Sequence, residues 1–158
     1  LDGVHIAATL RKCVEDARGD MPLEEFAECT LYVSHETCTR TCALHEVDAL
    51  RAVFGAATPS VRITNTKCYT GHMMGACVED VAAVAALTTQ RAPRVPLGEV
   101  DVAFSDLAFY EGGESSECLR FAIHVALGMG SHVAIVIYRL DRSVGSAAAG
   151  GRQGGVGS

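Results

Sequence analysis

The chain has 158 residues, of which 49% are apolar and 20% charged, a composition that predicts one globular domain rather than a disordered chain. Its formal net charge of -6 argues against a nucleic-acid-binding protein, which would need a basic surface. No apolar run reaches the roughly 18 residues that cross a bilayer. The chain begins at Leu1 without a recognisable signal peptide, so we expect a cytoplasmic or organellar fragment of a longer protein.

The predicted elements of the first half alternate between helix and strand. Apolar residues recur at helical spacing in two segments, and Gly19 and Gly55 are expected to end these helices. One short segment, CTLYVS, is rich in β-branched and aromatic residues and predicts a buried strand. The predicted order is a helix over 4–18, a turn or short helix from 20, a strand over 29–34, a helix over 44–54 and a strand over 60–65.

The second half is predicted to hold one buried helix and a strand pair. Gly71 and His72 stand at the start of an alanine-rich apolar segment, and two prolines exclude a helix after it. Two apolar runs near the end flank a glycine turn, which is typical of a β-hairpin. The predicted order is a helix over 73–87, a connection over 91–101, a strand over 118–127, a turn over 128–131 and a strand over 132–140.

Helices that alternate with short buried strands predict a layered α/β domain. We place this domain at residues 1–140 and a Gly/Ala/Ser-rich flexible tail or linker at 141–158. Polar residues with reactive side chains directly follow two of the predicted strands, where α/β folds usually place their sites. The seven cysteines are irregularly spaced, which favours reduced thiols in an intracellular compartment over a disulfide framework.

Four potential metal ligands lie within one short segment, at His35, Cys38, Cys42 and His45. Their number would suit zinc, but the segment lacks the CxxC or HxxxH pairs that usually hold the ion. His45 also falls within a predicted helix whose apolar face belongs to the core. We therefore expect no metal site here.

A second group comprises Lys67, Gly71 and His72. The glycine lets the backbone approach a ligand closely, and a neutral histidine could donate a hydrogen bond to a developing oxyanion or enolate. A surface lysine beside a helix-capping histidine fits the same spacing equally well. The glycine turn at 128–131, taken alone, indicates an ordinary hairpin turn.

In their order and spacing, these segments together resemble the C-terminal half of a β-ketoacyl synthase, a condensing enzyme of the thiolase superfamily. Residues 35–50, HETCTRTCALHEVDAL, line up without a gap on the family pattern HGTGTxxGDPxEVxAL. Residues 67–72 match KxxxGH, and residues 128–134 match the glycine turn GFGGxNA in part. The resemblance covers roughly residues 5–140 and implies a thiolase-like layered αβαβα fold with a mixed sheet and a buried helix.

The resemblance implies a decarboxylative Claisen condensation between an acyl thioester and a malonyl unit on the phosphopantetheine arm of an acyl carrier protein. His35 and His72 would hydrogen-bond the malonyl thioester and stabilise its enolate, and Lys67 would hold His72 in place. No cofactor would be bound by the chain itself. Substrate contacts are implied for Thr37, Thr39, Thr70, Gly128, Met129, Gly130 and Ser131.

The sequence departs from the family pattern at several positions. Glu36 and Cys38 replace two glycines of the first motif, and Met129 replaces a phenylalanine. The family commonly has a glutamate fourteen residues after the lysine, but that position is Val81 here, with Glu79 and Asp80 nearby. None of the seven cysteines has the strand-to-helix setting of the family's nucleophile, so the chain alone should be inactive.

We therefore expect an acyltransferase fragment that works with the N-terminal half of a ketosynthase and with an acyl carrier protein, as a homodimer when complete. No nucleic acid or membrane partner is expected. One alternative is a non-catalytic ketosynthase-like scaffold or chain-length-determining subunit. Another is a thiolase-type enzyme that uses coenzyme A substrates, although its usual cysteine is missing from the glycine turn at 128–131.

Overall fold

The structure is a computed structural model that describes residues 2–37, 39–73, 75, 77–112 and 119–141. Apart from Asp141, the tail predicted over 141–158 lies outside the described residues. Within the described ranges, no helix is both long and apolar enough to cross a membrane.

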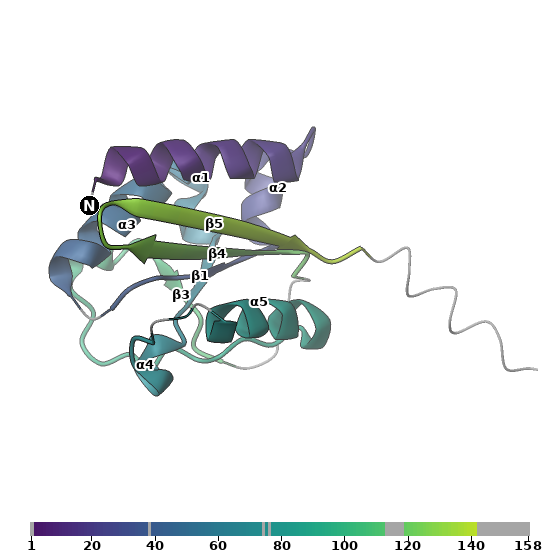
Figure 1. The fold of residues 1–158 in the computed structure, drawn as a ribbon. Helices are drawn as coiled ribbons and strands as arrows, with labels where there is room; N and C mark the ends of the chain where they lie inside the picture. Colours follow the sequence, from purple (N-terminus) through teal and green to yellow (C-terminus); the bar gives the residue numbers. More distant parts are fainter. Residues whose placement is uncertain (1, 38, 74, 76, 113–118, 142–158) are drawn as a thin grey trace, which may run out of the picture.

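Figure 1 shows the elements in chain order. The helices are α1 (Gly3–Arg18), α2 (Leu23–Glu28), α3 (Arg40–Phe54), α4 (Lys67–Thr70) and α5 (Cys77–Thr89), with two 3-10 segments, η1 (Gly55–Ser60) and η2 (Val102–Phe104). The strands are β1 (Thr30–Val33), β2 (Arg62–Thr64), β3 (Ala108–Phe109), β4 (Phe121–Gly128) and β5 (His132–Arg139).

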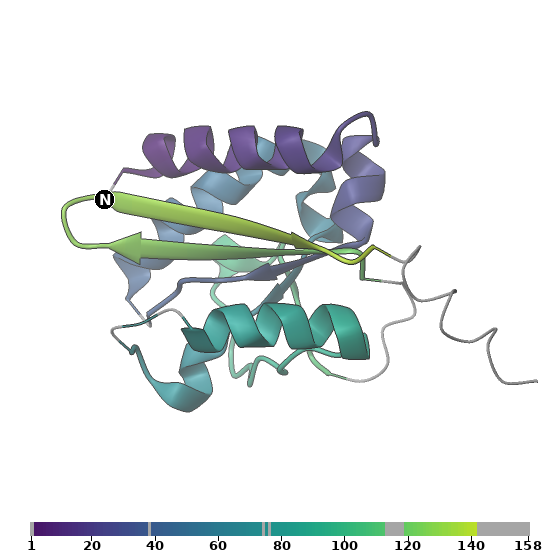
Figure 2. The ribbon, with the colours of Figure 1, turned by 45° about the vertical axis from the view of Figure 1, so that its right-hand side comes forward.

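The strands form one mixed sheet in the order β3-β2-β1-β4-β5. Strands β1 to β4 are parallel, and only β5 runs antiparallel, beside β4. Helices α1, α2 and α3 cover one face of the sheet and α5 covers the other (Figures 1 and 2). The predicted α/β class with a mixed sheet is confirmed, and the carboxyl ends of the parallel strands meet at one edge, where the site lies.

Apolar periodicity and capping residues determine helix α1. In α1, Ile6, Leu10 and Val14 are spaced one turn apart and are buried against α3 and the sheet. The Asp2 carboxylate accepts a hydrogen bond from the Val4 N–H at 3.0 Å and so caps the helix start. Gly19 ends the helix at φ 55°, a conformation that favours glycine. Each fully buried aliphatic side chain contributes about 1.5–3 kcal/mol.

Several boundaries differ from the prediction. Helix α3 begins at Arg40 rather than at residue 44, because the extended backbone ends at Thr39. The predicted helix start at Met73 is wrong, since α5 begins at Cys77. The short helix α4 and the strand β3 were not predicted. The hairpin of β4 and β5 is confirmed, with Gly130 and Ser131 both at positive φ in its turn.

Candidate active site

The candidate site is a pocket of about 490 Å³ at the carboxyl ends of β1 and β2 and beside the β4–β5 hairpin. His35 follows β1 by two residues, Lys67 begins α4 just after β2, and His72 follows Gly71 at the end of α4. The pocket is lined by His35, Lys67, His72, Met73, Gly75, Glu79, His124, Ala126, Leu127, Gly128, Met129, His132, Val133 and Ala134. The fold thus brings the three predicted catalytic residues together.

The rings of His35 and His72 meet edge to face, with centroids 5.2 Å apart and an angle of 89° between their planes. His35 is buried, whereas His72 is exposed at the mouth of the pocket. Burial lowers the pKa of His35 to about 4, and the charge of Lys67 and the ring of His72 act in the same direction. His35 is therefore a neutral imidazole at pH 7, able to donate a hydrogen bond without adding a charge.

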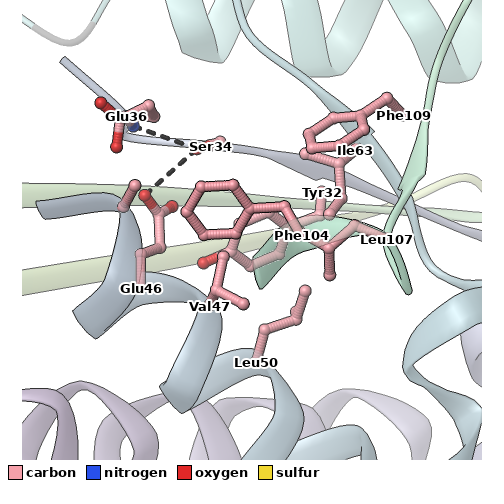
Figure 3. A pocket seen from close by; sticks show the side chains of 11 residues that line it. Tyr32, Ser34, Glu36, Glu46, Val47, Leu50, Ile63, Phe104, Leu107 and Phe109 are labelled. Carbon is pink, nitrogen blue, oxygen red and sulfur yellow. Dashed lines mark hydrogen bonds between the residues drawn. The ribbon is translucent and has the colours of Figure 1, made fainter. Parts of the chain in front are cut away.

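Glu46 of α3 holds the loop that carries His35. Its carboxylate accepts hydrogen bonds from the His35 backbone N–H at 2.8 Å and from the Ser34 hydroxyl at 3.1 Å. The Ser34 hydroxyl in turn accepts the Glu36 N–H at 3.0 Å (Figure 3). Burial raises the pKa of Glu46 to about 7, although the hydrogen bonds from His35 and Ser34 act in the opposite direction. The burial of Glu46 can be read from its spacing in the sequence, because it lies on the same helix face as the buried Ala49, Leu50 and Val53.

Lys67 forms an ion pair with Glu79, with 2.7 Å between Nζ and Oε1, and both side chains are only 5% exposed. Burial, the largest single cause, would raise the pKa of Glu79, but the hydrogen bond and charge of Lys67, together with smaller contributions, outweigh it and the pKa is lowered. The lysine partner left open by the sequence is therefore Glu79. Val81, the position that the family spacing indicated, is 68% exposed.

A third histidine of the pocket was missed. His124 lies within β4 and pairs with Val33 of β1, so the sheet register brings it beside the strand end that leads to His35. Its Nδ1 lies 2.7 Å from the Asp80 carboxylate, which also accepts the Tyr138 hydroxyl at 2.9 Å. Nothing in the sequence indicated that His124 belongs to the pocket. It stands as a single polar residue within an apolar strand, and its partners come from α5 and β5.

The predicted substrate contacts divide into two groups. Gly128 and Met129 line the pocket, and the Met129 side chain is 90% exposed at its rim. Gly130 and Ser131 continue the hairpin turn. The three threonines are not among the lining residues and make local contacts instead. The hydroxyls of Thr37 and Thr39 lie 3.5 Å apart, and the Thr70 hydroxyl donates to the Thr66 carbonyl at 3.3 Å across helix α4.

The potential metal ligands do not converge. His45 lies beside Gly3 at the start of α1, in a surface pocket away from the one that His35 lines. Burial, followed by the charge of Glu46, raises the pKa of Cys42 to about 11, which keeps its sulfur a thiol. Cys38 lies outside the described residues. In the part of the chain that the structure describes, no group of three or more His, Cys, Asp or Glu side chains could hold a metal ion.

A second, smaller cavity of about 110 Å³ lies between α3 and the sheet. Figure 3 shows the side chains that line it. Its walls are mainly apolar, formed by residues such as Leu50, Ile63 and Phe104. Glu46 and Ser34 stand at one side of it, already hydrogen-bonded to each other. The cavity therefore places the ionisable carboxyl of Glu46 in a largely apolar environment, which explains its raised pKa.

Comparison with known proteins shows the family of the chain. The profile of the family described as "Beta-ketoacyl synthase, C-terminal domain" matches residues 4–96. The chain belongs to this family. The 3-oxoacyl-[acyl-carrier-protein] synthase 2 of Staphylococcus aureus is 28% identical over 109 residues, covering 67% of this chain and 27% of that protein. The chain thus spans about a quarter of the length of the curated relatives it matches.

Solved ketosynthase structures share the fold of this β-ketoacyl synthase C-terminal domain. The noncanonical ketosynthase FabY from P. aeruginosa matches 94% of the chain and 24% of its own, with a TM-score of 0.73 and 17% identity. A β-ketoacyl synthase from Burkholderia phymatum STM815 matches 89% of the chain and 33% of its own, with a TM-score of 0.73 and 24% identity. The ketosynthase fold inferred from the motifs is therefore confirmed.

Proposed function

We propose that this β-ketoacyl synthase C-terminal domain contributes two histidines and a lysine to a decarboxylative Claisen condensation. The acyl donor would be a thioester on the complete enzyme, and the extender a malonyl unit on an acyl carrier protein. The observation that carries the proposal is the edge-to-face pair of His35 and His72 in one pocket, next to the buried ion pair of Lys67 and Glu79.

The chemistry requires hydrogen-bond donors more than proton transfer. When the bond to the malonyl carboxylate breaks and carbon dioxide leaves, the electron pair becomes an enolate whose charge lies on the thioester oxygen. N–H groups of His35 and His72 directed at that oxygen would stabilise it, and a single donor of this kind contributes about 10² to 10³ in rate. The enolate carbon then attacks the acyl thioester, and the enzyme thiolate leaves. A neutral His35 suits this role because it stays a donor throughout.

The acyl-carrying cysteine would come from the N-terminal half of the enzyme. Among the described cysteines (13, 29, 42, 68 and 77), none lines the pocket. We therefore propose that the chain is inactive alone and works in the cytoplasm as part of a homodimeric synthase. An acyl carrier protein as partner is supported by a fold relative, the ketosynthase of a type II polyketide synthase in complex with its acyl carrier protein.

The test uses the complete synthase with His35→Ala and His72→Ala, and His5→Ala as a control on the exposed side of α1. We expect each pocket variant to slow release of carbon dioxide from malonyl-carrier protein by about 10² or more, while mass spectrometry still detects the acyl group on the cysteine. If His72→Ala decarboxylated malonyl-carrier protein at the normal rate, the proposed role of His72 in stabilising the enolate would be wrong. A wild-type protein that never decarboxylates would point instead to the non-catalytic scaffold.

A further inference from the structure

The starting observation is a buried nitrogen without a partner. His124 is only 3% exposed, and its Nε2 has no hydrogen-bond partner among the described residues, although the ring lines the same pocket as His35 and His72. Buried polar atoms are normally paired, so an unpaired one in a pocket indicates a position that a ligand or water fills. Nothing in the condensation described above uses this atom.

The other side of the ring determines what Nε2 can do. The Asp80 carboxylate lies 2.7 Å from Nδ1, which makes Nδ1 the donor and leaves Nε2 as the unpartnered nitrogen of a ring that lines the pocket. A carboxylate behind a histidine orients the ring and stabilises its imidazolium form. The Tyr138 hydroxyl, at 2.9 Å, holds the same Asp80 oxygen. Burial would raise the pKa of Asp80, but the hydrogen bonds from His124 and Tyr138 outweigh it, so the carboxylate stays ionised.

The other ionisable side chains around the pocket are paired, neutral or at its rim. Lys67 is paired with Glu79 at 2.7 Å. His35 is neutral, as its low pKa shows. Nδ1 of His132 lies 2.7 Å from the Met129 carbonyl at the rim. His72 is exposed at the mouth, so His124 is the buried histidine of the pocket that has a carboxylate on one ring nitrogen and no partner on the other.

We propose that His124 is the specificity-determining residue of this site, whose Nε2–H binds the free carboxylate of a dicarboxylic monothioester such as a malonyl unit. The proposal rests on the proposed function, because it assigns the second functional group of the same substrate. A charge-assisted hydrogen bond to a carboxylate is roughly twice as strong as a neutral one. A substrate without the carboxylate leaves Nε2–H buried and unpaired, and sites built to bond a polar group strongly reject analogues that lack it.

The experiment measures binding to the complete synthase by calorimetry. The probes are amide analogues of malonyl-pantetheine and acetyl-pantetheine, in which an amide replaces the thioester so that no carbon dioxide is lost. In the wild-type enzyme the malonyl analogue should bind at least about tenfold more tightly. His124→Gln should remove most of that preference and leave the affinity for the acetyl analogue within about twofold.

Two further variants separate charge from packing. Asp80→Asn keeps the hydrogen-bonded shape but removes the carboxylate, so it should weaken the malonyl analogue selectively, as His124→Gln does. Tyr138→Phe leaves the contact between Asp80 and His124 intact and should change either affinity by less than about threefold. His5→Gln is the matched control on an exposed helix face.

The outcomes distinguish the two proposals. Equal weakening of both analogues by His124→Gln, or no change in either, would overturn the role of His124 while leaving the enolate site intact. His35→Ala and His72→Ala should weaken both analogues, because they bind the carbonyl that both share. If these two variants bind both analogues normally, the proposed function fails, whatever His124→Gln does. If the wild-type enzyme binds neither analogue, both proposals fall.

Discussion

Replacing Glu46 with Gln should stabilise the protein at neutral and alkaline pH. Glutamine keeps the acceptor oxygen for the His35 N–H, which lies 2.8 Å from Glu46 Oε1. It removes a carboxyl whose pKa burial raises from 4.5 to about 7. That rise corresponds to about 3 kcal/mol, at about 1.36 kcal/mol for each pH unit. This is the stability that the folded protein loses when the Glu46 carboxyl ionises in its apolar environment.

The sign follows from proton uptake. Between pH 4.5 and about 7 the folded protein holds a proton on Glu46 that the unfolded chain has released. Its contribution to stability is therefore complete below pH 4.5, falls as the pH rises to about 7 and stays constant above it. Glu46→Gln has no such dependence. The variant should match the wild type near pH 4.5 and exceed it by about 3 kcal/mol at pH 8.

Urea unfolding at several values between pH 4.5 and 8 gives both free energies of unfolding, and their difference isolates Glu46 from every other titrating group. Glu15→Gln, on the exposed side of α1, is the matched control and should show no pH-dependent difference. A constant difference between Glu46→Gln and wild type across this range would refute the reasoning, since Glu46 would then be ionised throughout.

Three further predictions concern the histidine pocket. Lys67→Met should destabilise the fold by about 3–5 kcal/mol in urea unfolding, because it leaves the Glu79 carboxylate buried without its partner. NMR titration should place the pKa of His35 at about 4, and the same lysine variant should raise it, because the cation that helps to lower it is gone. Gly71→Ala should lower the free energy of unfolding by of order 1–3 kcal/mol, since φ 73° and ψ 174° suit glycine alone. It should also slow decarboxylation by shifting His72. An unchanged unfolding curve would contradict this prediction.

Local patterns were enough for much of the fold. The periodicity of α1 and its terminating Gly19, the β-branched segment of β1 and the glycine turn of the last hairpin all depend on neighbours in the sequence, and the structure has them where they were predicted. The boundaries of α5 depend on more than periodicity. An apolar segment cannot show that the backbone turns away at Gly71 and resumes a helix only at Cys77.

The pocket chemistry depended on contacts that spacing could not supply. Family spacing placed the lysine partner at position 81, which is a valine here, and left Glu79 and Asp80 open as substitutes; the residue that reaches Lys67 is Glu79. Glu46 matched the glutamate of the family pattern but had no role assigned to it, and His124 was a polar residue within an apolar strand. Their roles come from partners 11 and 44 residues away, at His35 and Asp80, so only the folded chain reveals them.

Helix α5 connects the two halves of the pocket through adjacent residues. Glu79 pairs with Lys67 of α4, and Asp80 pairs with His124 of β4. Neighbouring helix residues point about 100° apart, so a single rotation of the helix places both carboxylates at their partners. With both carboxylates paired, the pocket presents mainly N–H donors, an arrangement that suits a substrate whose negative charge moves from a carboxylate to an enolate. Because both contacts depend on the same rotation of α5, a change that turned this helix would break both of them together.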